Sequence, residues 1–274
     1  MPEGPEIRKA ADKLEAAITR EAPREVFFAF EHLKPYETEL AQRPVTGVET
    51  RGKAMLIHFE GDLSIYSHNQ LYGVWMVRKA YSYPQTKRQL RLALHNSKKS
   101  ALLYSASDIE VLTPRQIESH SFLSRLGPDV LNRQLRPSQI LERLLDKAHQ
   151  RRQFTTLYLD QHFLAGIGNY LRSEILYVAR LHPRLRPVDC SEEQLQELAE
   201  ATKAVPYQSY RYSGITNDLD LANQLKAKGQ KRSQYRHWVF GRVGQPCRVC
   251  QTPIVKEFAS SRRYYYCPTC QPAA

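Results

Sequence analysis

Four of the five cysteines fall within the last 28 residues, as two Cys-x-x-Cys pairs. Cys247 and Cys250 form the first pair, and Cys267 and Cys270 form the second after sixteen intervening residues. Zinc binds four thiolates in a tetrahedron, and each pair can supply two of them from one tight turn. The spacing predicts a C-terminal zinc β-ribbon that holds one structural zinc ion.

Two disulfides are the alternative for these four cysteines. That pairing requires an oxidising compartment, whereas the N-terminus carries Glu3 and Glu6 and lacks the apolar core of an export signal. We therefore expect a soluble intracellular protein in which the four thiols bind zinc. The fifth cysteine, Cys190, is interpreted as an ordinary unpaired thiol.

The charge of the chain indicates a polyanionic partner. Its 274 residues include 40 Lys and Arg against 28 Asp and Glu, which gives a formal net charge of +12. The 42% of hydrophobic residues is enough to build a core, so the composition excludes overall disorder. No apolar run approaches the ~20 residues of a membrane helix. Nucleic acid is therefore a better interpretation of the charge than a membrane surface.

Hydrophobic periodicity divides the chain near residues 113–135. Residues 4–18 have the period of an amphipathic helix, and many short β-type runs follow between Val26 and Leu112. So many consecutive strands predict a sandwich or a barrel. The runs are VFFAF, VTGVETRG, AMLIHF, LSIYSH, VWMVR, LRLALH and ALLYSA.

After a capped helix start at 113–116, the pattern becomes helical. Ser191 and Gln194 form another capping box. The helical segments are ILERLLDKA, FTTLYLDQHFL, NYLRSEILYVARL and EEQLQELAEATKAV. We predict an α+β, multi-domain chain: residues 1–125 as a β-sandwich domain, 126–237 as a helical domain with a mobile loop at about 214–235, and 238–272 as the zinc ribbon.

The first residues could carry covalent chemistry. If Met1 is removed, Pro2 becomes a free secondary amine, and an α-amino group with a pKa near ~8 is partly neutral at physiological pH. Its attack on an aldehyde-level carbon gives a cationic iminium, and Glu3 would be close enough to transfer protons. The alternative interpretation is ordinary capping of a helix start by Pro and acidic residues.

Four other segments can each be interpreted either as a functional site or as a purely structural feature. The Gly-x-Gly stretch at 164–170 either lets a backbone pass close to another chain and presents a helix N-terminus to a phosphate, or is a plain turn between helices. Residues 51–53, Arg-Gly-Lys, lie on a turn between strands and are either a functional site or a solvated basic turn. Residues 68–73 lie at the end of a strand and are either a functional site or a partly buried hairpin. At 261–266, arginines interleaved with tyrosines favour contact with a nucleic-acid backbone.

Taken together and in order, these motifs resemble the formamidopyrimidine-DNA glycosylase / endonuclease VIII family, and more narrowly endonuclease VIII. The resemblance covers nearly the whole chain. It implies an N-terminal helix and β-sandwich, a helical domain with a helix–two-turn–helix motif, and a zinc β-ribbon. The matching stretches are MPEGPEI at 1–7, RGKA at 51–54, YSHNQLYGVW at 66–75, LGPDVL at 126–131, FLAGIGNYLRSEIL at 163–176, and SSR before the third ribbon cysteine.

The resemblance also implies a bifunctional DNA glycosylase and abasic-site lyase of base excision repair. Pro2 matches the nucleophile that attacks the sugar C1′, and Glu3 matches the acid that assists ring opening. Lys53 matches the lysine required for efficient base removal and elimination, which is held against a phosphate beside the lesion. Arg262, also counted with the catalytic residues, matches the ribbon arginine that binds the phosphates flanking the flipped nucleotide, and Asn169 matches a phosphate ligand. The family's chemistry cleaves the strand by β,δ-elimination.

Further matches concern binding of the DNA. Gln70, Leu71 and Tyr72 match residues that fill the gap left by the extruded base, and Arg125 matches a DNA contact. Glu6 matches a supporting carboxylate. The Gln-Leu-Tyr sequence favours the branch that removes oxidised pyrimidines.

Other functions stay open at this point. The strip at 207–236 departs from the endonuclease VIII pattern, so an oxidised-purine glycosylase of the same family is one alternative. A zinc-ribbon DNA-binding protein without catalysis is another. We expect damaged double-stranded DNA as the partner, no membrane association, a monomer, and a cytoplasmic location on the nucleoid.

Overall fold

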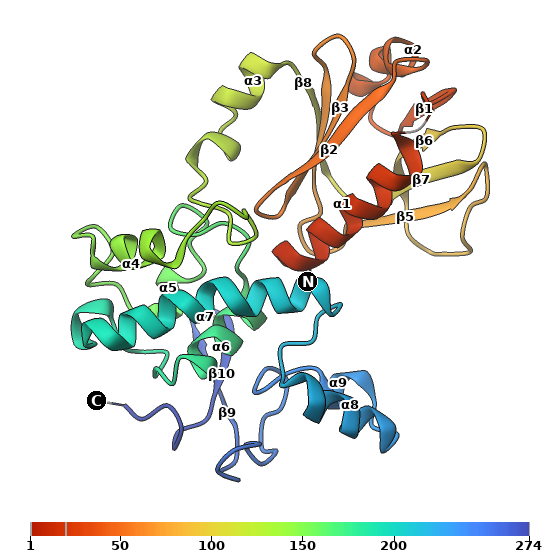
Figure 1. Cartoon of the computed structure of the whole chain (residues 1–274). Helices are drawn as coiled ribbons and strands as arrows, with labels where there is room; N and C mark the ends of the chain where they lie inside the picture. The colour runs from red at the N-terminus through yellow and green to blue at the C-terminus, as the bar shows by residue number, and fades with distance from the viewer. Residues whose placement is uncertain (1, 20, 274) are drawn as a thin grey trace. The chain divides into compact units, whose positions relative to one another are not determined.

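The structure is a computed structural model that describes residues 2–19 and 21–273 (Figure 1). Its contacts divide the chain into two compact units. The first contains Pro2 and the segment Glu6–Arg125, and the second contains Glu3–Pro5 and the chain from Leu126 onward. The tripeptide Glu3–Pro5 therefore packs with a part of the chain that lies more than a hundred residues away in sequence.

The first unit is built on two four-stranded antiparallel sheets, with strand orders β1-β6-β7-β5 and β2-β3-β4-β8. Residues from both sheets share one hydrophobic core, which gives a sandwich and excludes the barrel. The strands are β1 Glu25–Phe28, β2 Val45–Arg51, β3 Ala54–Phe59, β4 Ser64–His68, β5 Val74–Lys79, β6 Leu90–His95, β7 Lys99–Tyr104 and β8 Asp108–Leu112.

Helix α1, Gly4–Ile18, packs on this core (Figure 1). Ile7, Ala11, Leu14 and Ile18 recur at helical spacing and are at most 2% exposed, as the sequence predicts. The unit also contains helices α2, Pro35–Leu40, and α3, Pro114–Ser119, with 3-10 turns at Glu31–Leu33 and Leu123–Arg125. The Thr113 side chain accepts from Gln116 N, which confirms the predicted capping box.

The second unit is mainly helical. Helix α6 is buried on nearly every side, and α7 packs against both α4 and α6. The helices are α4 Pro137–Leu145, α5 Phe154–Leu157, α6 Asn169–Val178, α7 Glu192–Arg211, α8 Leu219–Ala227 and α9 Arg232–Tyr235, with a 3-10 turn at Pro187–Asp189. A bilayer-spanning helix is absent from residues 2–19 and 21–273, where each helix is too short or too polar.

Two of the predicted helices have different lengths in the structure. The segment predicted as a helix over 154–164 is helical only to Leu157, because side chains compete for the backbone beyond it. Asp160 Oδ1 accepts from His162 N, and Gln161 Nε2 donates to two carbonyls. Helix α7 instead continues past Pro206, which is buried in the helix interior, and ends at Arg211.

The strip predicted as a mobile loop at about 214–235 contains two helices, α8 and α9. The Asp218 carboxylate caps Leu221 N at 2.8 Å, and Ala222 is buried. The cap and the buried Ala222 stabilise a helix whose hydrophobic pattern is too weak to be recognised in the sequence.

The chain ends in a β-hairpin formed by β9, Val255–Ala259, and β10, Arg262–Tyr266. Its two-residue turn is made by Ser260 and Ser261, with φ of 45° and 63°. Both turn residues lie in the left-handed region, which is the geometry of the tightest hairpins. The predicted β-ribbon is confirmed.

Candidate active site and metal centre

The Glu3 side chain is buried at the N-terminus of α6. Its carboxylate accepts from Gly168 N at 2.7 Å, from Tyr170 N at 2.9 Å and from Leu171 N at 3.2 Å. These donors belong to the first turn of the helix, where backbone N–H groups lack helical partners and the helix dipole favours negative charge. These three hydrogen bonds hold the Glu3 carboxylate in one orientation.

The Gly-x-Gly stretch provides the space for this contact. A Cβ on Gly168 would lie 2.4 Å from Glu3 Cδ, so only glycine leaves room for the carboxylate. Gly166, at φ +97°, accepts from Gly4 N through its carbonyl at 2.8 Å. The two glycines thus allow the backbone of the N-terminal segment to pass close by, and the N-terminus of α6 binds the carboxylate of Glu3.

Lys53 lies in the two-residue turn between β2 and β3, as predicted. Gly52 adopts φ +62° there, which a glycine does without strain. On the same hairpin the Glu49 carboxylate contacts His58 Nε2 at 3.2 Å and accepts from Arg51 Nε at 2.9 Å. The hydrogen bond with His58, followed by those from Arg51, lowers the pKa of Glu49 to about 2.

Gln70, Leu71 and Tyr72 lie in the connection between β4 and β5. Leu71 and Tyr72 are 57% and 69% exposed, so two neighbouring large apolar residues are accessible at this turn. Pro2 and Arg125 belong to the same unit; Pro2 is half-buried, and Arg125 is exposed. Met1 lies outside the described residues.

Arg262 is the first residue of β10 and is exposed beside the hairpin turn. The buried Arg172 of α6 fixes the next residue, because its Nη2 donates to Arg263 O at 3.0 Å. The Arg172 guanidinium also lies over the ring of Tyr264 at 5.5 Å. Burial lowers the pKa of Arg172 to about 10.

Other groups on α6 hold the ribbon. The buried Glu174 carboxylate accepts from the backbone N of Trp238, Val239 and Phe240 at 2.8 to 2.9 Å. Burial raises the pKa of Glu174. Ser173 Oγ accepts from Tyr265 N. One helix therefore binds Glu3 at its N-terminus and the ribbon along its side, and Asn169 is its first residue.

Sequence reasoning missed Arg172 and Glu174 as organising residues. The available signal was two charged residues, two positions apart, in an otherwise apolar helix with buried neighbours. Charges on a buried helix need partners, and these two find backbone groups of the ribbon.

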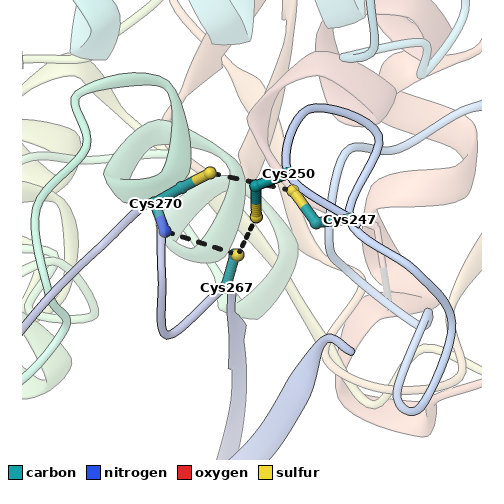
Figure 2. Close-up of side chains that lie close together, drawn as sticks. All are labelled: Cys247, Cys250, Cys267 and Cys270. Carbon is teal, nitrogen blue, oxygen red and sulfur yellow. Dashed lines mark hydrogen bonds between the residues drawn. The ribbon is translucent and has the colours of Figure 1, made fainter. Parts of the chain in front are cut away.

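The four ribbon cysteines converge on one point (Figure 2). The Sγ atoms of Cys247 and Cys270 lie 3.8 Å apart, those of Cys250 and Cys267 lie 3.4 Å apart, and all four lie within 4.8 Å of one another. Thiolates at about 2.3 Å from a tetrahedral zinc ion are about 3.8 Å apart, so the arrangement fits zinc. Tyr177 Oη lies 3.2 Å from Cys247 Sγ, as an outer hydrogen-bond partner.

Comparison with known families covers most of the chain. Residues 1–107 match the formamidopyrimidine-DNA glycosylase N-terminal domain, and residues 126–218 match the H2TH domain of the same enzymes. Residues 244–273 match a zinc finger found in FPG and IleRS. This last match and the four converging thiols identify the ribbon as a zinc site.

Full-length relatives agree with these matches. Endonuclease 8 of Escherichia coli is 50% identical over 271 residues, covering 99% of this chain and all of the relative, and endonuclease 8 of Klebsiella pneumoniae is 49% identical over the same length. The fold matches that of Lactococcus lactis Fpg in complex with abasic-site DNA, with a TM-score of 0.81 at 18% identity over 99% of this chain and all of that one. This chain belongs to the formamidopyrimidine-DNA glycosylase and endonuclease VIII family, whose members are DNA glycosylases and abasic-site lyases.

Proposed function

We propose that this chain, as a DNA glycosylase and abasic-site lyase of base excision repair, removes oxidised pyrimidines from duplex DNA through the nitrogen of Pro2. The observation that carries the proposal is the position of the Glu3 carboxylate. Glu3 follows Pro2 directly in sequence, and three backbone N–H groups hold its carboxylate. A carboxylate fixed one residue from a secondary amine is suited to proton transfer in iminium chemistry.

The reaction begins with the removal of Met1, which frees the Pro2 amine. The Pro2 nitrogen attacks C1′, the bond from C1′ to the base breaks, and the base leaves with a proton. Glu3 accepts the proton that the Pro2 nitrogen loses and transfers it to the ring oxygen as the bond from C1′ to that oxygen breaks. The product is a cationic iminium between Pro2 and C1′, which acts as an electron sink.

Two eliminations then cleave the strand. The iminium acidifies the C2′ hydrogen, whose loss expels the 3′ phosphate. A second elimination expels the 5′ phosphate and leaves a one-nucleotide gap with phosphates at both ends. Zinc, when bound, fixes the fold of the ribbon, and the chemistry is carried by Pro2 and Glu3.

Access to C1′ requires the damaged nucleotide to leave the stack, which costs a few kcal/mol. In the proposal Lys53, Asn169 and Arg262 hold successive phosphates of the kinked strand. Leu71 and Tyr72, which are exposed apolar groups, enter the gap with Gln70 and offset the unstacking. Arg125 provides a further DNA contact.

We further propose that the enzyme acts as a monomer in the cytoplasm, on damaged double-stranded DNA of the nucleoid. In this proposal the chain has three functional segments: a catalytic sandwich over 1–125, a helical DNA-binding segment over 126–237 and the zinc ribbon over 238–272. The net charge of +12 supports a polyanionic partner.

Matched duplexes that carry thymine glycol or 8-oxoguanine test the substrate class. We expect faster release of thymine glycol, with no release by Pro2→Gly. A strong preference for 8-oxoguanine would replace this assignment with the oxidised-purine alternative.

A further inference from the structure

The turn that carries Leu71 and Tyr72 has a backbone conformation that is energetically unfavourable. Gly73 N donates to Asn69 O at 2.7 Å, which closes the turn over residues 69–73. Gln70 has φ +47°, in the left-handed region that most residues avoid. A Cβ on Gly73 would lie 2.7 Å from Asn69 Cα, so the turn is too tight for any other residue there. A turn of this kind needs partners outside itself to keep one shape.

Two neighbouring loops supply these partners. From the β5–β6 connection, Arg88 Nη1 donates to the Tyr72 carbonyl at 2.5 Å. From the β7–β8 connection, Ser107 Oγ donates to Gln70 Oε1 at 3.0 Å. The turn is thus held on both sides, through the backbone of Tyr72 and the side chain of Gln70.

The hydrogen bond from Arg88 to the Tyr72 carbonyl is suited to positioning the turn. It is made to a backbone oxygen, so it sets the direction of the turn and leaves the Tyr72 ring free to stack on bases. Arg88 N also donates to Thr86 Oγ1 at 3.2 Å, which orders the loop from which the guanidinium reaches. A charged donor makes a stronger hydrogen bond than a neutral one.

We propose that Arg88 is a positioning residue for base extrusion, which holds the Tyr72 carbonyl so that Leu71 and Tyr72 enter the duplex together. This inference rests on the proposed function, in which those two side chains fill the gap. Arg88 acts through the turn and does not touch the reacting atoms.

A double-mutant cycle tests the inference. Arg88→Ala is made in the wild-type chain and in the Leu71→Ala/Tyr72→Ala chain, and single-turnover base excision is measured for each. We expect about a fivefold loss in the first background, the equivalent of the typical net contribution of one hydrogen bond, and less than a twofold loss in the second. An equal loss in both backgrounds would overturn the proposal, because Arg88 would then act independently of the two side chains.

A base-stacking reporter gives a second readout. We expect 2-aminopurine placed next to the lesion to show a smaller fluorescence increase on binding of the Arg88→Ala protein than of the wild type. Lys87→Ala is the matched control, since it removes an exposed cation from the same loop and leaves the Arg88 bond in place. An increase in the Arg88→Ala complex that equals the wild type would contradict a role in extrusion.

The exposed guanidinium could instead bind a phosphate, and the salt dependence separates the two roles. A positioning residue leaves the slope of log K against log salt unchanged, whereas loss of one phosphate contact lowers it by about 0.9 and would overturn the inference. Borohydride trapping of the wild type on abasic DNA separates this outcome from failure of the proposed function. If the wild type traps and the cycle is additive, only the role of Arg88 fails.

Discussion

Gly168 is the residue on which the geometry of Glu3 most directly depends. Gly168→Ala would place a Cβ 2.4 Å from Glu3 Cδ without changing any charge. Since Glu3 must then move from its three backbone donors, we predict at least a tenfold loss of base excision, roughly the effect of a misplaced catalytic group. Single-turnover excision and thermal unfolding of the variant measure this.

Gly229→Ala is the control for this substitution. Gly229 has φ +77°, and an added Cβ would meet no heavy atom within 4 Å, so the change costs backbone strain alone. We expect excision by Gly229→Ala to equal that of the wild type. If Gly168→Ala also excises at the wild-type rate, the position of Glu3 is not critical for catalysis.

The lowered pKa of Glu49 makes the stability of the folded chain depend on pH. Its pKa in the folded chain, about 2, lies below its ordinary value, so its contribution is complete at neutral pH and is lost as the pH falls from about 5 toward 2. Because the side chain is 41% exposed, we expect Glu49→Gln to cost only about 1 kcal/mol at pH 7. Urea unfolding should show this difference at pH 7 and a smaller one at pH 3; a constant difference would contradict the assignment.

At the scale of elements, the ribbon depends on zinc. Cys247→Ser or chelation should unfold the hairpin, because the binding energy of a structural zinc ion is folding energy. Trp238 packs against Tyr177 with ring centroids 5.5 Å apart, so its fluorescence reports the loss. We predict that strand cleavage disappears with the zinc, since Arg262 lies on the same hairpin. Cleavage that persists after verified zinc removal would contradict this prediction.

Elements with strong local patterns could be predicted from the sequence. The apolar spacing of α1, the β-type runs and the cysteine spacing are each present within a short window. The segment after Leu157 could not be predicted, because its helix ends through side-chain bonds of Asp160 and Gln161 that no periodicity reveals. The same holds for the site: motifs pointed to Glu3, whereas Arg172 acts on the ribbon ninety residues later through a contact that only the fold creates.

At the scale of the whole molecule, the surplus of positive charge governs DNA binding. Each phosphate contact releases counterions and contributes about 0.9 to the slope of log K against log salt. We therefore predict that Arg262→Ala lowers that slope by about one. Arg263→Ala is the matched control, since its guanidinium lies over the Phe240 ring at 5.6 Å. Equal slopes for Arg262→Ala and the wild type would exclude a phosphate contact by Arg262.

In the proposed reaction, Pro2 becomes covalently bonded to deoxyribose. Sodium borohydride reduces an iminium to a stable amine, so it should trap this chain on duplex DNA that carries an oxidised pyrimidine. Mass spectrometry of the digested complex should then locate the sugar on the nitrogen of Pro2, with Met1 absent. A cross-link on any lysine, or no cross-link from a chain that begins at Pro2, would contradict the account.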